Sequence, residues 1–175
     1  MATTIKEVVE AFDLLYHSLR RKDFSKSYRL HEWSEAELLP LVRCFLLGYF
    51  GKALSPELAA KLPGSLTGHG RIDFLVDDVA VEFAVRRPSA ARAVLSSTVN
   101  ASEVKKLMKF DGKALLVLFD FSKIPFDDED IERFRDWPSL GKGNHKKSAF
   151  NIAYFHRTGT APAAYDIFLK NIRVN

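Results

Sequence analysis

The first twenty residues carry apolar side chains at every third or fourth position, which is the spacing of an amphipathic helix. Thr4 and Glu7 stand three residues apart, like the two partners of a capping box, so the helix is expected to begin after Thr4. Basic residues at 20–22 suit a helix carboxyl end, where the dipole favours cations. The pattern predicts an N-terminal helix within residues 4–22, and we interpret its basic cluster as a solvated helix end rather than a nucleic-acid contact.

A second capping box, Ser34 with Glu37, predicts another helix that runs to about Phe50. Pro40 lies inside this segment, where proline removes a backbone hydrogen bond, so the helix is expected to kink there or to start later. Apolar residues nearly encircle the segment. We therefore expect this helix to be well buried, with Cys44 as a core residue rather than a nucleophile.

Two short apolar runs at 70–76 and 79–87, joined by a two-residue Asp-Asp turn, predict a β-hairpin. Before the hairpin, a short helical piece is expected to begin at Ser55, with Pro56 at the tolerated first position. Residues 62–69 then lead into the hairpin and are expected to supply an edge strand. The hairpin is thus expected to belong to a larger sheet.

The rest of the chain alternates between helical and strand patterns. A continuous apolar run at 113–121 suits a strand covered on both faces, which is typical of parallel pairing after a helical crossover. Around it the patterns predict helices at 90–95, 102–110 and 127–135 and strands at 150–156 and 165–174. Together these elements predict one α/β or α+β domain over residues 1–175, with a mixed central β-sheet flanked by helices.

Each strand of the predicted hairpin carries a carboxylate at its centre, Asp73 in the first strand and Glu82 in the second. Side chains alternate along a strand, so Asp73 is expected to share a face with Arg71 and to lie opposite Ile72 and Phe74. An unpaired buried charge is costly, and the two acids therefore need a compensating cation. A divalent metal ion is one candidate for that cation.

Composition narrows the class of protein. The 175-residue chain has no stretch near the roughly 20 apolar residues that span a bilayer. The N-terminus lacks the basic and apolar regions of a signal peptide, and one cysteine rules out an internal disulfide, so we expect a cytoplasmic protein. The formal charge of +4 permits a polyanionic partner without establishing one. The five histidines lack zinc-ligand spacing.

The order of predicted elements is helix, edge strand, strand with Asp73, strand with Glu82, helix and apolar strand. With the segments Gly70-Arg71-Ile72-Asp73-Phe74 and Val81-Glu82-Phe83-Ala84-Val85, this order resembles the PD-(D/E)XK nuclease superfamily over about residues 34–121. The resemblance implies a restriction-endonuclease-like core. It also implies a metal-dependent phosphodiesterase that acts on DNA or RNA, so nucleic acid is the expected partner.

For the site, the resemblance implies a metal centre. Asp73 and Glu82 would bind Mg²⁺ or Mn²⁺, with the Phe83 carbonyl as a third ligand. Glu35 or Glu37 in the preceding helix resembles an acidic residue that some family members add. Hard cations prefer such oxygen ligands, and the ion would generate the nucleophile and stabilise the developing charge on phosphate.

The sequence departs from the family pattern at Ala84, where the family has a lysine. Arg86 lies two residues further on the same face; it stays protonated at neutral pH, so it is no general base, but it can clamp a phosphate. Lysines of the following helix are another source of a cation, as in some relatives. The candidate substrate-binding residues are Arg71, Arg87, Lys105, Lys106, Lys142 and Lys146.

Several alternatives stay open on sequence grounds. Asp73 and Glu82 could form ordinary cross-strand ion pairs with Arg71 and Arg86, and the helix lysines could form a solvated face. The missing lysine also fits a nuclease-fold module without catalytic activity that binds nucleic acid or a protein partner. Finally, the strands predicted near the C-terminus could pair with another chain in an oligomer.

Overall fold

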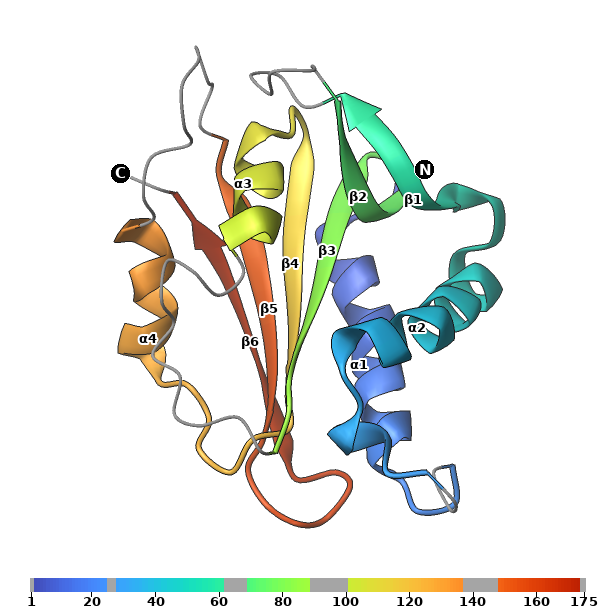
Figure 1. Ribbon diagram of the computed structural model, residues 1–175, viewed down its shortest axis with the longest axis vertical. Helices are drawn as coiled ribbons and strands as arrows, with labels where there is room; N and C mark the ends of the chain where they lie inside the picture. Colours follow the sequence, from blue (N-terminus) through green and yellow to red (C-terminus); the bar gives the residue numbers. More distant parts are fainter. Residues whose placement is uncertain (1, 25–27, 62–68, 89–100, 137–147, 174–175) are drawn as a thin grey trace.

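The computed structural model describes residues 2–24, 28–61, 69–88, 101–136 and 148–173, which build a six-stranded mixed sheet with helices on both faces (Figure 1). Strands follow one another across the sheet in chain order: β1 (Leu54–Lys61), β2 (His69–Val76), β3 (Val79–Arg86), β4 (Lys113–Asp120), β5 (Phe150–Arg157) and β6 (Tyr165–Ile172). The β1, β2 and β3 strands are antiparallel neighbours, β3, β4 and β5 run parallel, and β6 is antiparallel to β5. The predicted mixed central sheet flanked by helices is confirmed.

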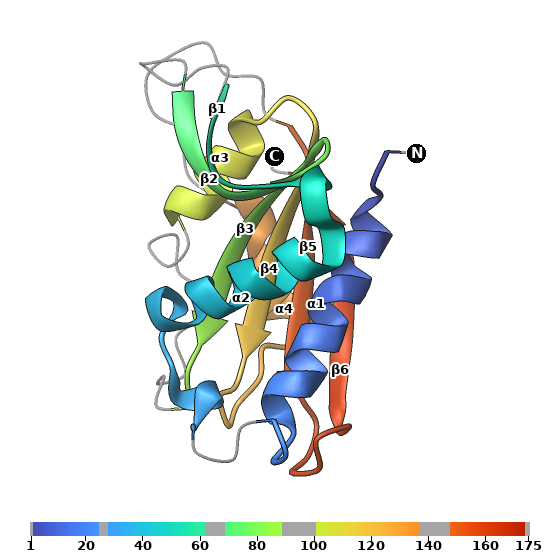
Figure 2. The ribbon, with the colours of Figure 1, turned by 90° about the vertical axis from the view of Figure 1, so that its right-hand side faces the viewer.

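In the described part of the chain, two α-helices lie on each face of the sheet. The helices α1 (Ile5–Arg20) and α2 (Glu35–Phe50) lie on one face, and α3 (Ala101–Lys109) and α4 (Asp128–Glu132) lie on the other (Figures 1 and 2). Short 3₁₀ helices occur at Leu30–Glu32 (η1), Gly51–Ala53 (η2) and Arg133–Asp136 (η3). Each face of the sheet therefore has its own apolar core. Among the described helices, none combines the length and the apolarity that crossing a membrane requires.

Both predicted capping boxes are present. The Thr4 side chain accepts from the Glu7 backbone while Glu7 reaches back to Thr4, and Ser34 and Glu37 do the same for α2. The α2 helix begins at Glu35 and continues through Pro40, so the proline does not delay its start. Local side-chain chemistry thus sets where both helices begin.

The burial predicted for α2 is wrong. Only one stripe of the helix is buried, formed by Leu38, Val42 and Leu46. Cys44 is exposed, and so is Tyr49, at 48%. The physical reason is that α2 packs through a single side against α1, β1 and β3, so its apolar composition exceeds what the contact needs.

The helix predicted from Ser55 is also wrong, because Leu54–Lys61 forms the edge strand β1. Its pairing with β2 runs from Leu54 opposite Val76 to Lys61 opposite His69, and these nonlocal hydrogen bonds outweigh the local helix signal. Proline is tolerated in an edge strand, since its missing N–H need not interrupt a ladder on the open side. Of the predicted edge strand at 62–69, only the last residue lies among the described residues, where it opens β2.

The apolar run at 113–121 behaves as predicted. It forms β4, which lies between the parallel strands β3 and β5 and is buried on both faces. The helix predicted at 102–110 corresponds to α3, and the strands predicted near the C-terminus correspond to β5 and β6. The predicted helix at 127–135 is divided into α4 and η3, and the one at 90–95 lies outside the described residues.

Candidate functional site

The candidate site lies where β2 separates from β3. The two strands pair from Val76 opposite Val79 to Phe74 opposite Val81, and there the pairing ends, although β2 continues beside β1. At the next residue, an Oδ2 atom of Asp73 accepts the backbone N–H of Phe83 at 2.9 Å. The Asp73 carboxylate thus replaces the backbone carbonyl that would accept this N–H in a continuous β-ladder. In Figure 2 the first half of β2 rises with β1 away from the rest of the sheet.

The alternation expected along β2 does not hold across Asp73. Phe74 packs into the core under α1 and α2, as expected for one face. Ile72 packs instead into the core beside α3, together with Ala80 and Val104. The change occurs at the residue where β2 leaves β3, because a strand held on one side only can rotate relative to its former neighbour. As a result, Asp73 lies at the seam between the two strands.

Glu82 occupies the centre of the site and is completely buried. Its Oε2 atom accepts a hydrogen bond from the Lys106 ammonium of α3 at 2.6 Å. Its other oxygen, Oε1, is buried and accepts no N–H or hydroxyl hydrogen bond from the described residues, and the Asp73 carboxyl lies within hydrogen-bond reach of the Glu82 carboxyl. Burial and repulsion from Asp73 raise the pKa of Glu82 to about 8, even though Lys106 acts in the opposite direction. One ammonium therefore leaves this carboxylate incompletely compensated.

Two further acids, Glu35 and Glu103, lie near Asp73 and Glu82. Glu35, the first residue of α2, is half-buried, and burial together with repulsion from Asp73 and Glu103 raises its pKa to about 7. Burial also raises the pKa of Asp73 above its ordinary value, although the Phe83 N–H and Lys106 stabilise its charged form. Among the described residues, Glu35, Asp73, Glu82 and Glu103 thus share the Lys106 ammonium, and that excess of negative charge favours an added cation.

Glu37 does not lie with these four acids. Its Oε2 atom accepts from the Ser34 backbone N–H at 2.7 Å and caps α2, and these hydrogen bonds lower the pKa of Glu37. Of the two acids proposed from the sequence of this helix, the structure therefore brings Glu35 to the site.

Arg86 is engaged elsewhere. It lies opposite Asp120 in the parallel register of β3 and β4, and its Nη1 atom binds an Asp120 oxygen at 2.7 Å. The same atom donates to the Ile124 carbonyl at 2.9 Å, and the guanidinium lies 3.9 Å from the centre of the Phe126 ring. Arg86 is only 8% exposed. The alternative in which Arg86 pairs with an acid of the hairpin therefore does not hold, and Lys106 is the cation beside Glu82.

The remaining candidates are scattered. Arg71 and Arg87 are exposed, and the positive charge of Arg87 lowers the pKa of Glu37, which places Arg87 near the first turn of α2. Lys105 is half-buried on α3 beside Lys106. The predicted contacts of Lys142 and Lys146 lie outside the described residues.

Within the described residues, no group of three or more His, Cys, Asp and Glu side chains is arranged to hold a metal ion alone. A backbone oxygen can complete the donor set, however. The N–H and C=O of a residue in an extended strand point the same way, so the Phe83 carbonyl faces the side on which β2 no longer pairs. Mg²⁺ typically uses one or two carboxylates and retains several waters. The unpaired Glu82 oxygen and the uncompensated charge fit such an ion.

No family model, curated protein or solved structure matches this chain. The site must therefore be interpreted from its own chemistry. The sequence pattern does not distinguish Lys106 from the other lysines of α3. The available signal was its spacing: Glu103 and Lys106 stand three residues apart, which places them on one flank of a helix, and both interact with Glu82.

Proposed function

We propose that this chain is a divalent-metal-dependent phosphodiesterase that cleaves DNA or RNA through a PD-(D/E)XK-like site. The observation that carries the proposal is the convergence of Asp73, Glu82 and Lys106 where β2 parts from β3. One buried Glu82 oxygen there has no N–H or hydroxyl donor among the residues that the structure describes. The order α2, β1, β2, β3, α3, β4 supports it, because the same order of elements underlies the resemblance.

The metal-binding role falls to Asp73, Glu82 and the Phe83 carbonyl. When bound, Mg²⁺ or Mn²⁺ would supply a water of lowered pKa and withdraw charge from a phosphate oxygen. Asp73 is held for this role by the Phe83 N–H, and Glu82 by Lys106, so both carboxylates are oriented before any ligand arrives. Preorganised ligands of this kind are what a hydrolytic site requires.

In this proposal Lys106 takes the role of the family's lysine, whose position is occupied by Ala84 in this chain. Its ammonium carries three donors, one of which binds Glu82 Oε2, so others are available to a phosphate oxygen or to a water. The side chain is 25% exposed and is therefore reachable from solvent. Arg86 takes no part in this arrangement because its guanidinium is bound to Asp120.

Glu35 is the proton acceptor in this proposal. Its pKa of about 7 lies near physiological pH, the range in which a carboxylate can both accept and release a proton efficiently. It enters from α2, on the opposite face of the sheet from Lys106. The water to be deprotonated would lie between them.

A cleavage assay tests the proposal. Labelled single- and double-stranded DNA and RNA are incubated with the protein in Mg²⁺, in Mn²⁺ and in EDTA. Cleavage is expected only with metal, and the variants Asp73→Asn and Glu82→Gln should reduce it by at least about a thousandfold, as for loss of a group essential to transition-state charge. Cleavage that is unchanged in either variant, or that proceeds in EDTA, would contradict the proposal.

Ala84 favours a second candidate function, a nuclease-fold module that binds nucleic acid or a protein partner without cutting it. This candidate predicts that nucleic acid stays intact in the presence of Mn²⁺. It also predicts that binding of nucleic acid or of a protein partner survives Glu82→Gln. The matched pair Lys106→Met and Lys105→Met separates the two functions. If Lys106 has the role of the family's lysine, Lys106→Met should abolish cleavage and Lys105→Met should not.

A further inference from the structure

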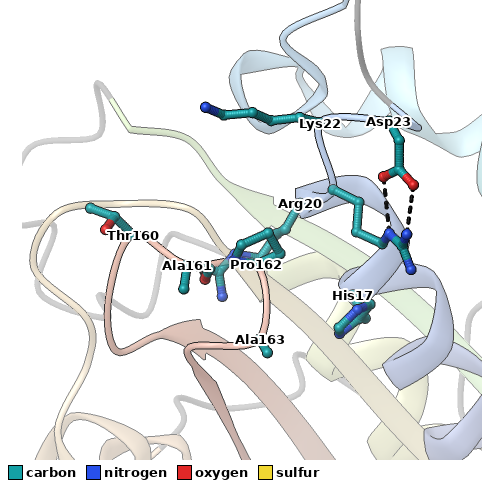
Figure 3. A pocket seen from close by; sticks show the side chains of 9 residues that line it. His17, Arg20, Lys22, Asp23, Thr160, Ala161, Pro162 and Ala163 are labelled. Atoms are coloured by element: carbon teal, nitrogen blue, oxygen red, sulfur yellow. Dashed lines mark hydrogen bonds and ion pairs between the residues drawn. The ribbon is translucent and has the colours of Figure 1, made fainter.

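A second polar region, formed by residues other than those of the acidic site, lies at the carboxyl end of α1. Two adjoining cavities of about 710 and 260 Å³ share Arg20, Lys22 and Thr160, and together we name them the basic pocket. They form where the carboxyl end of α1 meets η1 and the loop between β5 and β6, in the lower part of Figure 1. Figure 3 shows the larger cavity from close by, with the β5–β6 loop opposite the end of α1.

Basic residues line the pocket, four of them arginine or lysine and two histidine: Arg20, Arg21, Lys22, Arg157, His17 and His31. The acid in its lining, Asp23, is bound by Arg21 through contacts of 2.9 and 2.5 Å. Figure 3 shows Lys22 extending to the opposite side from this pair. The basic pocket therefore retains a net positive charge.

Arg20 is held rigidly in the wall of the basic pocket. Its guanidinium donates to the backbone carbonyls of Gly159, Ala161 and Ala164 at 2.8 to 2.9 Å. Arg157 lies close enough that its charge, added to the effect of burial, lowers the pKa of Arg20. Neither arginine has a carboxylate partner in the described part of the chain. Two cations are thus brought together without an anion between them.

The interpretation of 20–22 as a solvated helix end does not account for this arrangement. The helix dipole explains why cations follow α1. It does not explain why β5 adds Arg157 and η1 adds His31 to the same cavity. Like charges repel, so the addition of Arg157 from β5 to the cations at the end of α1 is best accounted for by an anionic ligand.

Exposed aromatic residues stand close in the chain to Asp23 and His31, two residues that line the basic pocket. Phe24 follows Asp23 and is 51% exposed, and Tyr28 is 63% exposed. The Tyr28 ring meets Trp33 edge to face, with 5.7 Å between centroids. Trp33 lies two residues before Glu35 of the acidic site, so the segment from Tyr28 to Glu35 connects the two regions. We name Phe24, Tyr28 and Trp33 the aromatic platform.

We infer that the basic pocket and the aromatic platform bind single-stranded nucleic acid, the pocket receiving backbone phosphates and the exposed rings stacking on bases. Basic grooves with exposed aromatic rings bind single strands in this way, because every base offers a stacking face once it is unpaired. Bases inside a duplex are already stacked and cannot meet the rings. The inference rests on the proposed function for the identity of the polymer and specifies its preferred strandedness.

Fluorescence anisotropy in EDTA tests the inference without cleavage. The probes are a labelled single strand of about a dozen nucleotides, in DNA and RNA forms, the matching duplex and a labelled mononucleotide. The single strand is expected to bind at least about tenfold more tightly than the duplex. In the double variant Lys22→Gln/Arg157→Gln, the slope of log affinity against log salt should fall by about 1.4, which is two contacts of about 0.7 each on a single strand.

Matched variants control for charge and for aromatic content. Lys6→Gln/Lys52→Gln removes two exposed charges elsewhere and should leave the slope unchanged. Tyr28→Ala should weaken single-strand binding roughly tenfold through loss of stacking. Tyr49→Ala, at the other end of α2 and similarly exposed, should not.

The outcomes separate this inference from the proposed function. Equal or tighter binding of the duplex, binding of the mononucleotide alone, or equal losses in the matched controls would overturn it, even if metal-dependent cleavage is found. Single-strand binding that depends on Arg157 and Tyr28 would sustain it, even if no cleavage is seen and the proposed function fails. Circular dichroism of each variant establishes that the fold is retained.

Discussion

The β3 strand carries two buried charged residues on one face, Glu82 and Arg86, and their surroundings differ. The Asp120 partner of Arg86 also accepts from the Tyr154 hydroxyl at 2.6 Å and, through its second oxygen, from the Ser122 backbone N–H at 2.7 Å. Glu82 has Lys106 and an oxygen that receives no N–H or hydroxyl hydrogen bond within the described part of the chain. A buried pair whose carboxylate is fully hydrogen-bonded holds a structure together. A buried carboxylate left partly unpaired is poised to bind something else.

The largest effect is expected from Asp120→Ala, which leaves Arg86 buried without its counter-ion. Removing one partner of a buried pair costs about 3–5 kcal/mol, because the remaining charge is uncompensated. Urea denaturation followed by circular dichroism should show this loss in the free energy of unfolding. A loss below about 1 kcal/mol would mean that the two charged sites on β3 are not as different as their contacts indicate.

The second largest effect is expected in how the free energy of unfolding depends on pH. The pKa of Glu82 is about 8 in the folded protein and near 4.5 when unfolded. The folded state therefore binds its proton more tightly, so this contribution is fully present below about pH 4.5 and is lost as pH rises through 8. Relative to Glu82→Gln, the wild-type protein should lose roughly 2–4 kcal/mol of unfolding free energy between these limits. A difference that is flat with pH would contradict the raised pKa.

Binding of Mn²⁺ at Asp73 and Glu82 should restore the unfolding free energy that is lost at high pH. At a hundredfold excess over its dissociation constant, Mn²⁺ is expected to stabilise the protein by about 2.7 kcal/mol, seen as a rise in melting temperature. The ion competes with protons for Glu82 and Asp73, so the rise should be larger near pH 8 than near pH 6. Glu82→Gln should abolish it. An equal rise in that variant would place the ion elsewhere.

The smallest effect is expected from Lys106→Met. The ion pair with Glu82 is partly exposed, so its loss should lower the unfolding free energy near pH 8 by about 1–2 kcal/mol. Lys105→Met, one residue away on α3, should change it by less than about 0.5 kcal/mol. Equal effects in the two variants would show that the contact with Glu82 contributes nothing specific.

Local signals predicted the parts of the fold that depend on local chemistry. Thr4 and Ser34 cap helices because their partners stand three residues away, and the apolar run in β4 is evident without knowledge of its neighbours. The strand β1 was predicted as helix because its stability comes from β2, and the open face of α2 depends on how few elements pack on it.

The same division applies to the site. Asp73 and Glu82 could be identified from the hairpin pattern, and the structure brings them together. The location of Arg86 on their strand was also evident, but its partner was not. Asp120 lies opposite Arg86 only because of the register between β3 and β4, which no spacing in the sequence reveals. Lys106 likewise required the placement of α3.

The hydrogen bond between the Asp73 carboxylate and the Phe83 amide makes that amide a reporter of the site. In an ordinary sheet, exchange of a central backbone proton with solvent deuterium reports the opening of neighbouring strands. Here the proton is held by an ionisable side chain, so its exchange rate depends on what else claims that carboxylate. A cation or a proton taken up by Asp73 would change the rate at Phe83 while leaving that of Val117, in the adjoining β4, unaltered. Occupancy of the site can thus be followed at one backbone amide, without substrate or turnover.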